Sequence, residues 1–277
     1  MMGNFHPATL ASAALSIVKA DDLDEKIETA KRTTAAWFGR RLPAARTSGK
    51  LDFPDRPGRP DLPVLLPPRD MPKRSTSGVK GRFALLHSLA HIELSAIDMT
   101  WDLTARFAHI NLPRAFLDDW VQVGLEEAKH LELLLRRLSE LGGGYGDLPA
   151  HDGLWQAAQA TKHDLLARLA VVPLVLEARG LDVSPAMIEK LEVAGDTASA
   201  SILTVIYRDE KRHVAAGMRW FRFLCHRKGL PLERTFHRLV QQYFRGALKP
   251  PFNDAARSEA GLTPGFYKPL TAFGAPP

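Results

Sequence analysis

Two short motifs in this sequence have the spacing of metal ligands. Glu127 and His130 form one Glu-x-x-His motif, and Glu210 and His213 form another. Residues three apart share one face of a helix, so each motif can offer a carboxylate oxygen and an imidazole nitrogen to one ion. Each motif also interrupts an apolar stripe of the kind that a helix turns toward its core. The stripes are Phe116, Trp120, Val123, Glu127, His130, Leu134 and Leu203, Ile206, Glu210, His213, Gly217, Trp220, Leu224.

Two further glutamates interrupt apolar stripes of their own. Glu93 follows Leu86 and Ala90, and Glu177 follows Leu166, Ala170 and Pro173 at helical spacing. The order along the chain is therefore Glu, Glu-x-x-His, Glu, Glu-x-x-His, with 34 residues from Glu93 to Glu127 and 33 from Glu177 to Glu210. This is an internal repeat of helix pairs that is visible in the candidate ligands.

These four carboxylates are expected to share one core. Burying an isolated carboxylate costs several kcal/mol, and four that converge repel one another, so a pair of cations is the natural compensation. This ligand set is that of ferritin-like di-iron carboxylate proteins. Its oxygen and imidazole donors favour two iron ions, manganese or a mixed Mn/Fe pair over copper or a closed zinc site. The alternative is four buried glutamates neutralised by arginine or by protonation. The predicted metal ligands are Glu93, Glu127, His130, Glu177, Glu210 and His213.

Three residues beside the motifs are candidates for supporting roles. Glu126 and Asp209 each precede a ligand glutamate, and a metal-bound histidine usually donates its second ring N–H to a carboxylate or carbonyl. We expect Asp209 to orient His130; for Glu126, orientation of His213 and a solvated charge are equally good interpretations. Tyr207 lies one turn before Glu210, where packing is favoured over a hydrogen bond or a redox role near the metals.

Other polar pairs and one proline on the same helices have structural interpretations. His87 and His91 lie about 120° or more around the helix from Glu93, so they are predicted to be a partly buried pair against a proline-rich segment. Asp98 and Asp102 are predicted to cap or to bind arginine. Pro173 should kink its helix or force a bulge one turn before Glu177.

The elements that would position these residues are helices. Period-two alternation is scarce, which disfavours a sheet. Asn111 to Pro113, Gly142 to Gly144, Gly180 and Gly229 supply stop or start signals. The expected long helices are 79–109, 114–141, 152–179 and 197–227, with a short helix from Ser184 and another helix from 231 to 246. Long helices with short connections predict an all-α, ferritin-like antiparallel four-helix bundle.

Proline marks the remaining segments. Eight of the 20 prolines lie between Pro43 and Pro72, and six lie from Pro250 to Pro277. These segments are expected to be irregular arms that wrap the body, anchored by apolar side chains. Residues 7–18 and 22–40 read as helices. The predicted division is therefore N-terminal helices at 1–42, an arm at 43–77, the di-metal bundle at 78–230, and a C-terminal helix and tail at 231–277. The anchors are Leu62, Val64, Leu65, Leu66, Phe252, Phe266 and Tyr267.

Composition excludes several classes of protein. The 277 residues carry a net charge of +6, and no apolar run is long enough to span a membrane. One cysteine, Cys225, rules out a disulfide framework, a four-cysteine zinc site and a cysteine-held iron–sulfur cluster within one chain. No basic region precedes the mildly apolar N-terminal stretch, so the expectation is a cytoplasmic protein without a signal peptide. Residues 219–257 hold nine Lys/Arg against two acidic residues and could contact a polyanion.

Five stretches of the chain carry a resemblance to a known family: PPRDMPKRS (67–75), ALLHSLAHIELSAIDM (84–99), EEAKHLELL (126–134), RDEKRHVAAGMRWF (208–221) and FRGALKPPFNDAAR (244–257). They resemble a ferritin-like family of bacterial proteins whose function is not established, the domain of unknown function DUF455. The resemblance covers most of the chain and implies a di-metal core with two proline-rich arms. More distantly, the arrangement is similar to that of the ferritin-like tRNA hydroxylase.

Three functions are compatible with these observations. The favoured one is an oxidase or hydroxylase that uses dioxygen and an unidentified small-molecule or RNA substrate, because six ligands leave coordination positions open on two irons. The second is iron storage or detoxification, which the long arms disfavour because they would crowd a ferritin-type cage. The third is a nucleic-acid-directed role such as tRNA modification. A monomer or small homo-oligomer is expected.

Overall fold

In the computed structural model, the fold is described for residues 7–45, 51–67, 70–72 and 78–271. These residues form helices and connecting loops, and no β-strand occurs among them; a single bridge pairs Leu65 with Ala150. The predicted all-helical class is therefore confirmed. The chain divides into two compact units, Met1–Trp155 (unit 1) and Gln156–Pro277 (unit 2). None of the helices in the described part is long and apolar enough to cross a membrane.

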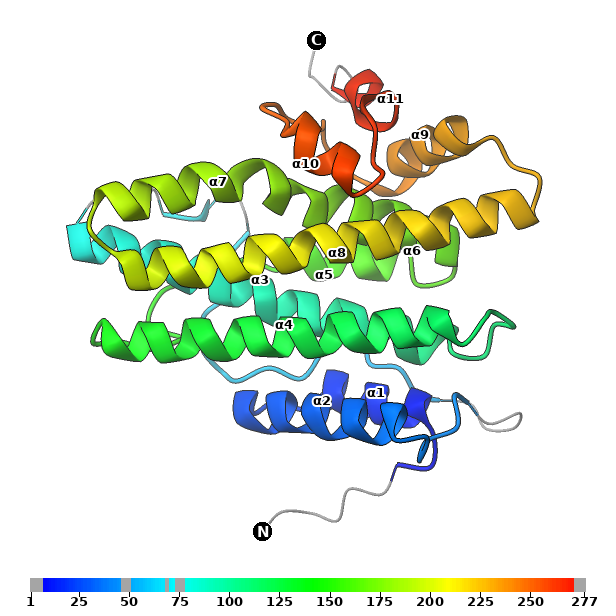
Figure 1. Cartoon of the computed structure of the whole chain (residues 1–277). Coiled ribbons are helices and arrows are strands. Elements are labelled where there is room, and N and C mark those ends of the chain that lie inside the picture. Colours follow the sequence, from blue (N-terminus) through cyan, green and yellow to red (C-terminus); the bar gives the residue numbers. More distant parts are fainter. Residues whose placement is uncertain (1–6, 46–50, 68–69, 73–77, 272–277) are drawn as a thin grey trace. The chain divides into compact units, whose positions relative to one another are not determined.

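Unit 1 is built from two pairs of helices (Figure 1). The short α1 (Leu10–Lys19) and α2 (Leu23–Phe38) precede the long α3 (Gly78–Phe107) and α4 (Ala115–Glu140). The seven-residue connection between α3 and α4 makes them antiparallel neighbours, while α1 packs on α3 and α2 packs on α4. Thr9 and Asp22 cap α1 and α2 with their side chains. The sequence signals thus place all four helices to within about three residues.

The first proline-rich arm lies on unit 1 but is held differently from the prediction. The expected anchors Leu62 and Val64 are more than half exposed. Backbone bonds hold the arm instead, from the Gly58 amide to the Val18 carbonyl and from the Leu66 amide to the Ala150 carbonyl. Proline-rich chain cannot pair its backbone regularly, so isolated side-chain contacts, such as that of Arg59 with Asp98, add to these bonds. Residues 46–50, 68–69 and 73–77 of this arm lie outside the described residues.

Unit 2 is organised around the antiparallel pair α7 (Ala178–Val193) and α8 (Thr197–Arg227). Before them come α5 (Gly153–Ala160), at the boundary of the units, α6 (Leu165–Val171) and the π-helix η2 (Val172–Glu177). After them come α9 (Leu232–Tyr243), α10 (Asp254–Glu259), α11 (Pro264–Tyr267) and the 3₁₀ turn η3 (Lys268–Leu270). Helix α9 packs on α6 and α8, and α10 packs on α7 and α8.

The helix expected at 152–179 is the main error of the sequence prediction. The chain turns between α5 and α6, where the Asp164 carboxylate caps α6 by accepting from the Leu166 amide. The buried Arg168 stabilises this break by donating to the Thr161 hydroxyl and the Ala158 carbonyl. The predicted stop at Gly180 is also wrong, because α7 continues through Gly180 and Pro185 to Val193. Packing of Leu181 and Leu191 in the core outweighs the weak helix propensity of Gly180 and Pro185.

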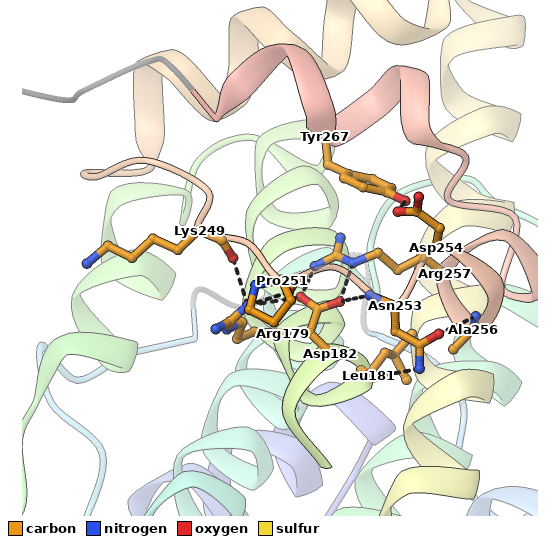
Figure 2. Close-up of polar contacts among 10 residues, drawn as sticks. All are labelled: Arg179, Leu181, Asp182, Lys249, Pro251, Asn253, Asp254, Ala256, Arg257 and Tyr267. Carbon is orange, nitrogen blue, oxygen red and sulfur yellow. Dashed lines mark hydrogen bonds and ion pairs between the residues drawn. The ribbon is translucent and has the colours of Figure 1, made fainter. Parts of the chain in front are cut away.

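The second proline-rich segment is less irregular than expected, because α10 and α11 form within it. Asn253 caps α10, and the apolar anchors Phe266 and Tyr267 are buried as predicted. Figure 2 shows how the segment is fixed to α7: Asp182 accepts two hydrogen bonds from the Arg257 guanidinium, at 2.8 and 2.7 Å, and a third from the Asn253 amide. We call these three residues the tail clamp.

Candidate metal centre

Unit 1 brings three of the predicted ligands together. Glu93 comes from the middle of α3, and Glu127 and His130 come from one face of α4. Each residue offers one donor atom, and these atoms lie within 4.8 Å of one another. The His130 Nδ1 is 3.2 Å from a Glu93 carboxylate oxygen and 3.5 Å from a Glu127 oxygen. All three side chains are buried, so the group is a dry set of two carboxylates and one imidazole.

The electrostatics of this group show what a cation would offset. The pKa of the Glu93 carboxyl is raised to about 7, chiefly by burial; the His130 hydrogen bond opposes this shift and the neighbouring Glu127 adds to it. Without a metal, Glu93 would therefore be about half protonated near pH 7. A bound cation reverses this preference because it stabilises the ionised carboxylate.

Two other buried carboxylates of unit 1, Asp98 and Asp102, are neutralised by the protein itself. Asp98 lies 2.6 Å from the Lys26 ammonium and 2.8 Å from the Arg59 guanidinium, and Asp102 lies 2.7 Å from Arg106. The prediction that these aspartates bind cationic side chains is confirmed. Unit 1 therefore contains two kinds of buried carboxylate: Asp98 and Asp102 have a cationic side chain beside them, while Glu93 has a histidine and a second carboxylate.

Unit 2 brings the other three predicted ligands together. Glu177 is the last residue of the π-helix, and Glu210 and His213 share a face of α8. One donor atom from each lies within 4.8 Å of the others, and the His213 Nδ1 is 3.8 Å from a Glu210 oxygen. These side chains are also buried. Unit 2 thus repeats the donor set of unit 1: a glutamate from one helix and a Glu-x-x-His pair from the next.

The π-helix before Glu177 has an identifiable cause. Pro173 lacks the N–H that an α-helix would use at this point, and the chain takes a π-helical path from Val172 to Glu177. The predicted bulge is confirmed. Helix α8 approaches the proline closely at Gly217, where an added Cβ would lie 2.5 Å from the Pro173 Cβ. A glycine is therefore required for Pro173 to reach α8 at this level.

The three candidate supporting residues lie beside the groups. Glu126 and Asp209 are both buried; Glu126 accepts from Gln122, and Asp209 accepts from Arg212 at 2.7 Å. The proposal that they orient His213 and His130 stays a prediction. The Tyr207 hydroxyl accepts a 3.2 Å hydrogen bond from the Asn253 side chain, so this tyrosine is joined to the tail clamp.

The histidine pair of α3 has partners that sequence reasoning missed. His91 bonds the Tyr145 hydroxyl and the His151 carbonyl, at 2.7 and 2.9 Å, and His87 accepts from the Gly146 amide. Both rings are buried rather than partly exposed, and burial lowers the pKa of His91 to about 4. They fix the loop that follows α4. Tyr145, an aromatic residue in a glycine-rich loop, was the sequence signal that could have pointed to these contacts.

Comparison with known proteins agrees with the sequence resemblance. The family model described as "Protein of unknown function (DUF455)" matches residues 19–268. A relative from Haemophilus influenzae, described as an uncharacterized protein, is 42% identical over 209 residues, which cover 74% of this chain and 73% of the relative. No solved structure matches the chain. With the family model spanning nearly the whole sequence, the chain belongs to the DUF455 family of proteins of unknown function.

Proposed function

We propose that the chain holds two metal ions in one ferritin-like centre to which both units contribute. The observation that carries this proposal is the repeated donor set, a buried glutamate with a buried Glu-x-x-His pair, once in each unit. Three donors are few for an ion that prefers five or six, whereas the two sets together supply the four carboxylates and two imidazoles of a di-iron carboxylate protein. The ligands would be Glu93, Glu127, His130, Glu177, Glu210 and His213.

The donors suit iron, manganese or a mixed pair of the two. Carboxylate oxygens and imidazole nitrogens are ligands for such ions, and six side chains leave coordination positions open. Bound iron would supply the redox chemistry for reaction with dioxygen, which makes an oxidase or hydroxylase the function that we favour. Its organic substrate is not identified. The part played by the chain is to bury the donors, exclude water and hold each imidazole beside its carboxylates.

Individual residues have distinct tasks in this proposal. Glu93 would give up the proton that burial favours when a cation binds, so metal binding would release a proton. Glu126 and Asp209 would hold the second ring nitrogens of the two histidines and fix their orientation. Tyr207 lies one turn before Glu210 and would couple the tail clamp to the donor set of unit 2.

The test is anaerobic loading with Fe(II) followed by exposure to dioxygen. We expect stopped-flow absorbance to show oxidation of the loaded iron and Mössbauer spectra to show two coupled ferric ions. Glu127→Ala and Glu210→Ala should abolish both signals, while Glu140→Ala, on the exposed end of α4, should leave them unchanged.

Two results would contradict the proposal. Parent-like iron binding by both ligand variants would show that the ligands are wrong. Uptake of many irons per chain, in a large cage on sizing, would show iron storage instead of catalysis; a monomer or small oligomer that stops at two irons supports the proposal.

A further inference from the structure

The positive charge of the chain is confined to its second unit. Residues 156–277 hold 17 Lys/Arg against 11 Asp/Glu, whereas residues 1–155 hold 20 of each. The excess of basic over acidic residues is greatest between Lys211 and Asn253, which hold ten basic residues and one acidic residue, Glu233. The ten are Lys211, Arg212, Arg219, Arg222, Arg227, Lys228, Arg234, Arg238, Arg245 and Lys249. A charge excess of this density is an electrostatic footprint for an anionic partner.

Most of these charges lie on α8 and α9, two helices that pack together. Phe221 of α8 and Phe236 of α9 meet edge to face with ring centroids 6.0 Å apart, so both apolar faces point inward. Six basic residues at the end of α8 and along α9 are exposed. We call them the α8–α9 basic surface: Arg219, Arg222, Arg227, Lys228, Arg234 and Arg238.

The two helices also border one surface cavity. The cavity has a volume of about 470 Å³, and Arg222 of α8 and Arg234 of α9 both line it. Thr263 and Phe266 from the C-terminal segment complete part of its wall, and Glu233 is its acidic residue. Two guanidinium groups and a hydroxyl are groups that hold a phosphate.

The side chains of this surface select among anionic partners. Insertion into a membrane needs a face of exposed apolar residues, but Phe236, Leu239 and Val240 of α9 are buried and Leu232 is half-buried. Five of the six basic residues are arginine, whose planar group binds phosphate with two parallel hydrogen bonds and stacks on rings. Phe223 is 36% exposed beside them, with the Arg227 guanidinium 5.7 Å from its ring centroid. Stacking with arginine and aromatic rings favours nucleic acid over an acidic protein.

We propose that the α8–α9 basic surface binds single-stranded nucleic acid, with phosphates held by its arginines and a nucleotide seated in the cavity between Arg222 and Arg234. This proposal goes beyond the metal centre and does not depend on it. The surface would bring a nucleic-acid partner to the protein whether the metal ions are bound or not.

The test measures fluorescence anisotropy of a labelled 20-nucleotide single-stranded RNA of mixed sequence, with the full chain at several salt concentrations. Four phosphate contacts predict a slope of about −2.8 for log K against log salt, which is roughly a 50-fold loss of affinity between 50 and 200 mM salt. Arg222→Glu with Arg234→Glu should weaken binding at least about tenfold and reduce the slope to about −1.4. The milder pair Arg222→Gln with Arg234→Gln covers the case in which charge reversal prevents folding.

The matched control changes the same net charge elsewhere. Arg41→Glu with Arg136→Glu, two exposed positions in unit 1, should leave the affinity within about twofold. Equal losses in the two double variants would overturn the proposal, because net charge alone would then explain binding. Absence of RNA binding at 50 mM salt would overturn it as well, and so would equal competition by a polyglutamate peptide of the same charge.

Discussion

The two donor sets have the same ligands but different supports. In unit 1, Glu93 lies in the middle of a regular 30-residue α-helix. In unit 2, the corresponding Glu177 ends a π-helix whose path is set by Pro173. Spacing along the chain differs by one residue between the repeats, yet each brings its three donors within 4.8 Å. The position of the donors is thus independent of how regular the supporting helix is.

The residue three positions before each Glu-x-x-His motif shows a second difference. In unit 1 it is Gly124, where an added Cβ would lie 2.6 Å from the Trp101 indole. In unit 2 it is Tyr207, whose hydroxyl reaches Asn253 of the tail clamp. Trp101 therefore packs against α4 at this position, while the same position of α8 is linked to the C-terminal segment. We therefore expect the donor set of unit 2 to be the more adaptable of the two.

The largest expected effect comes from removing one imidazole from each donor set. His130→Ala and His213→Ala should each lower the affinity for both metal ions by at least about 100-fold, because a shared centre loses a donor in either case. Two independent centres would instead give one lost ion per variant. Metal analysis of protein loaded with Fe(II) under argon distinguishes these results, and His109→Ala, on the loop after α3, serves as the control.

The second prediction concerns the carboxylates of unit 1 that have protein counterions. Lys26→Met should lower the free energy of unfolding by about 3 to 5 kcal/mol, because it removes a fully buried ammonium that bonds Asp98 and the Ile17 carbonyl. Lys31→Met removes a partly exposed ion pair and should cost less than about 1 kcal/mol. Urea unfolding measures both. Similar values for the two variants would show that burial does not set the strength of the Lys26 pair.

The third prediction tests the close approach of helix α8 to the π-helix. Gly217→Ala should destabilise the protein by about 1 to 3 kcal/mol, because its Cβ would lie 2.5 Å from Pro173. Gly180→Ala should stabilise it by up to about 1 kcal/mol, because the nearest atom, the Glu210 Cγ, is 3.9 Å away and alanine favours helix. Thermal unfolding should give shifts of opposite sign. Shifts of the same sign would contradict this packing.

The smallest effect is expected at the link between the tail clamp and Tyr207. Tyr207→Phe removes the acceptor for the Asn253 side chain and should cost about 0.5 to 1.5 kcal/mol without loss of metal. Chemical unfolding and metal analysis of the same sample give both quantities. Loss of metal in this variant would place Tyr207 among the ligands and enlarge the donor set of unit 2.

The fold was predictable where one pattern dominates. Helices α3, α4 and α8 follow long apolar stripes with clear stop signals, and α8 is predicted at its observed ends. The break at Asp164 was not predictable, because it depends on the bonds from the buried Arg168 to Thr161 and Ala158, which form only in the folded unit. Gly180 and Pro185 misled for the same reason, since tertiary packing outweighs local propensity.

The donor sets were predictable because burying a charged residue on an apolar stripe costs free energy unless a counterion or a metal ion compensates it. Their surroundings were not, since the partners of Tyr207 and His91 come from Asn253 and Tyr145, far away in sequence. The anchors of the first arm were misjudged because apolar residues in a proline-rich segment carry no period that shows which side is buried.

The central claim is that one chain holds two metal ions through both donor sets, and anaerobic titration with Fe(II) tests it most directly. Calorimetry and iron analysis after gel filtration follow this titration. The parent protein should saturate at two ions per chain. The Glu93→Ala and Glu177→Ala variants, one from each unit, should both fall well below that number. Saturation at zero or one ion in the parent, or undiminished binding in both variants, would contradict the account.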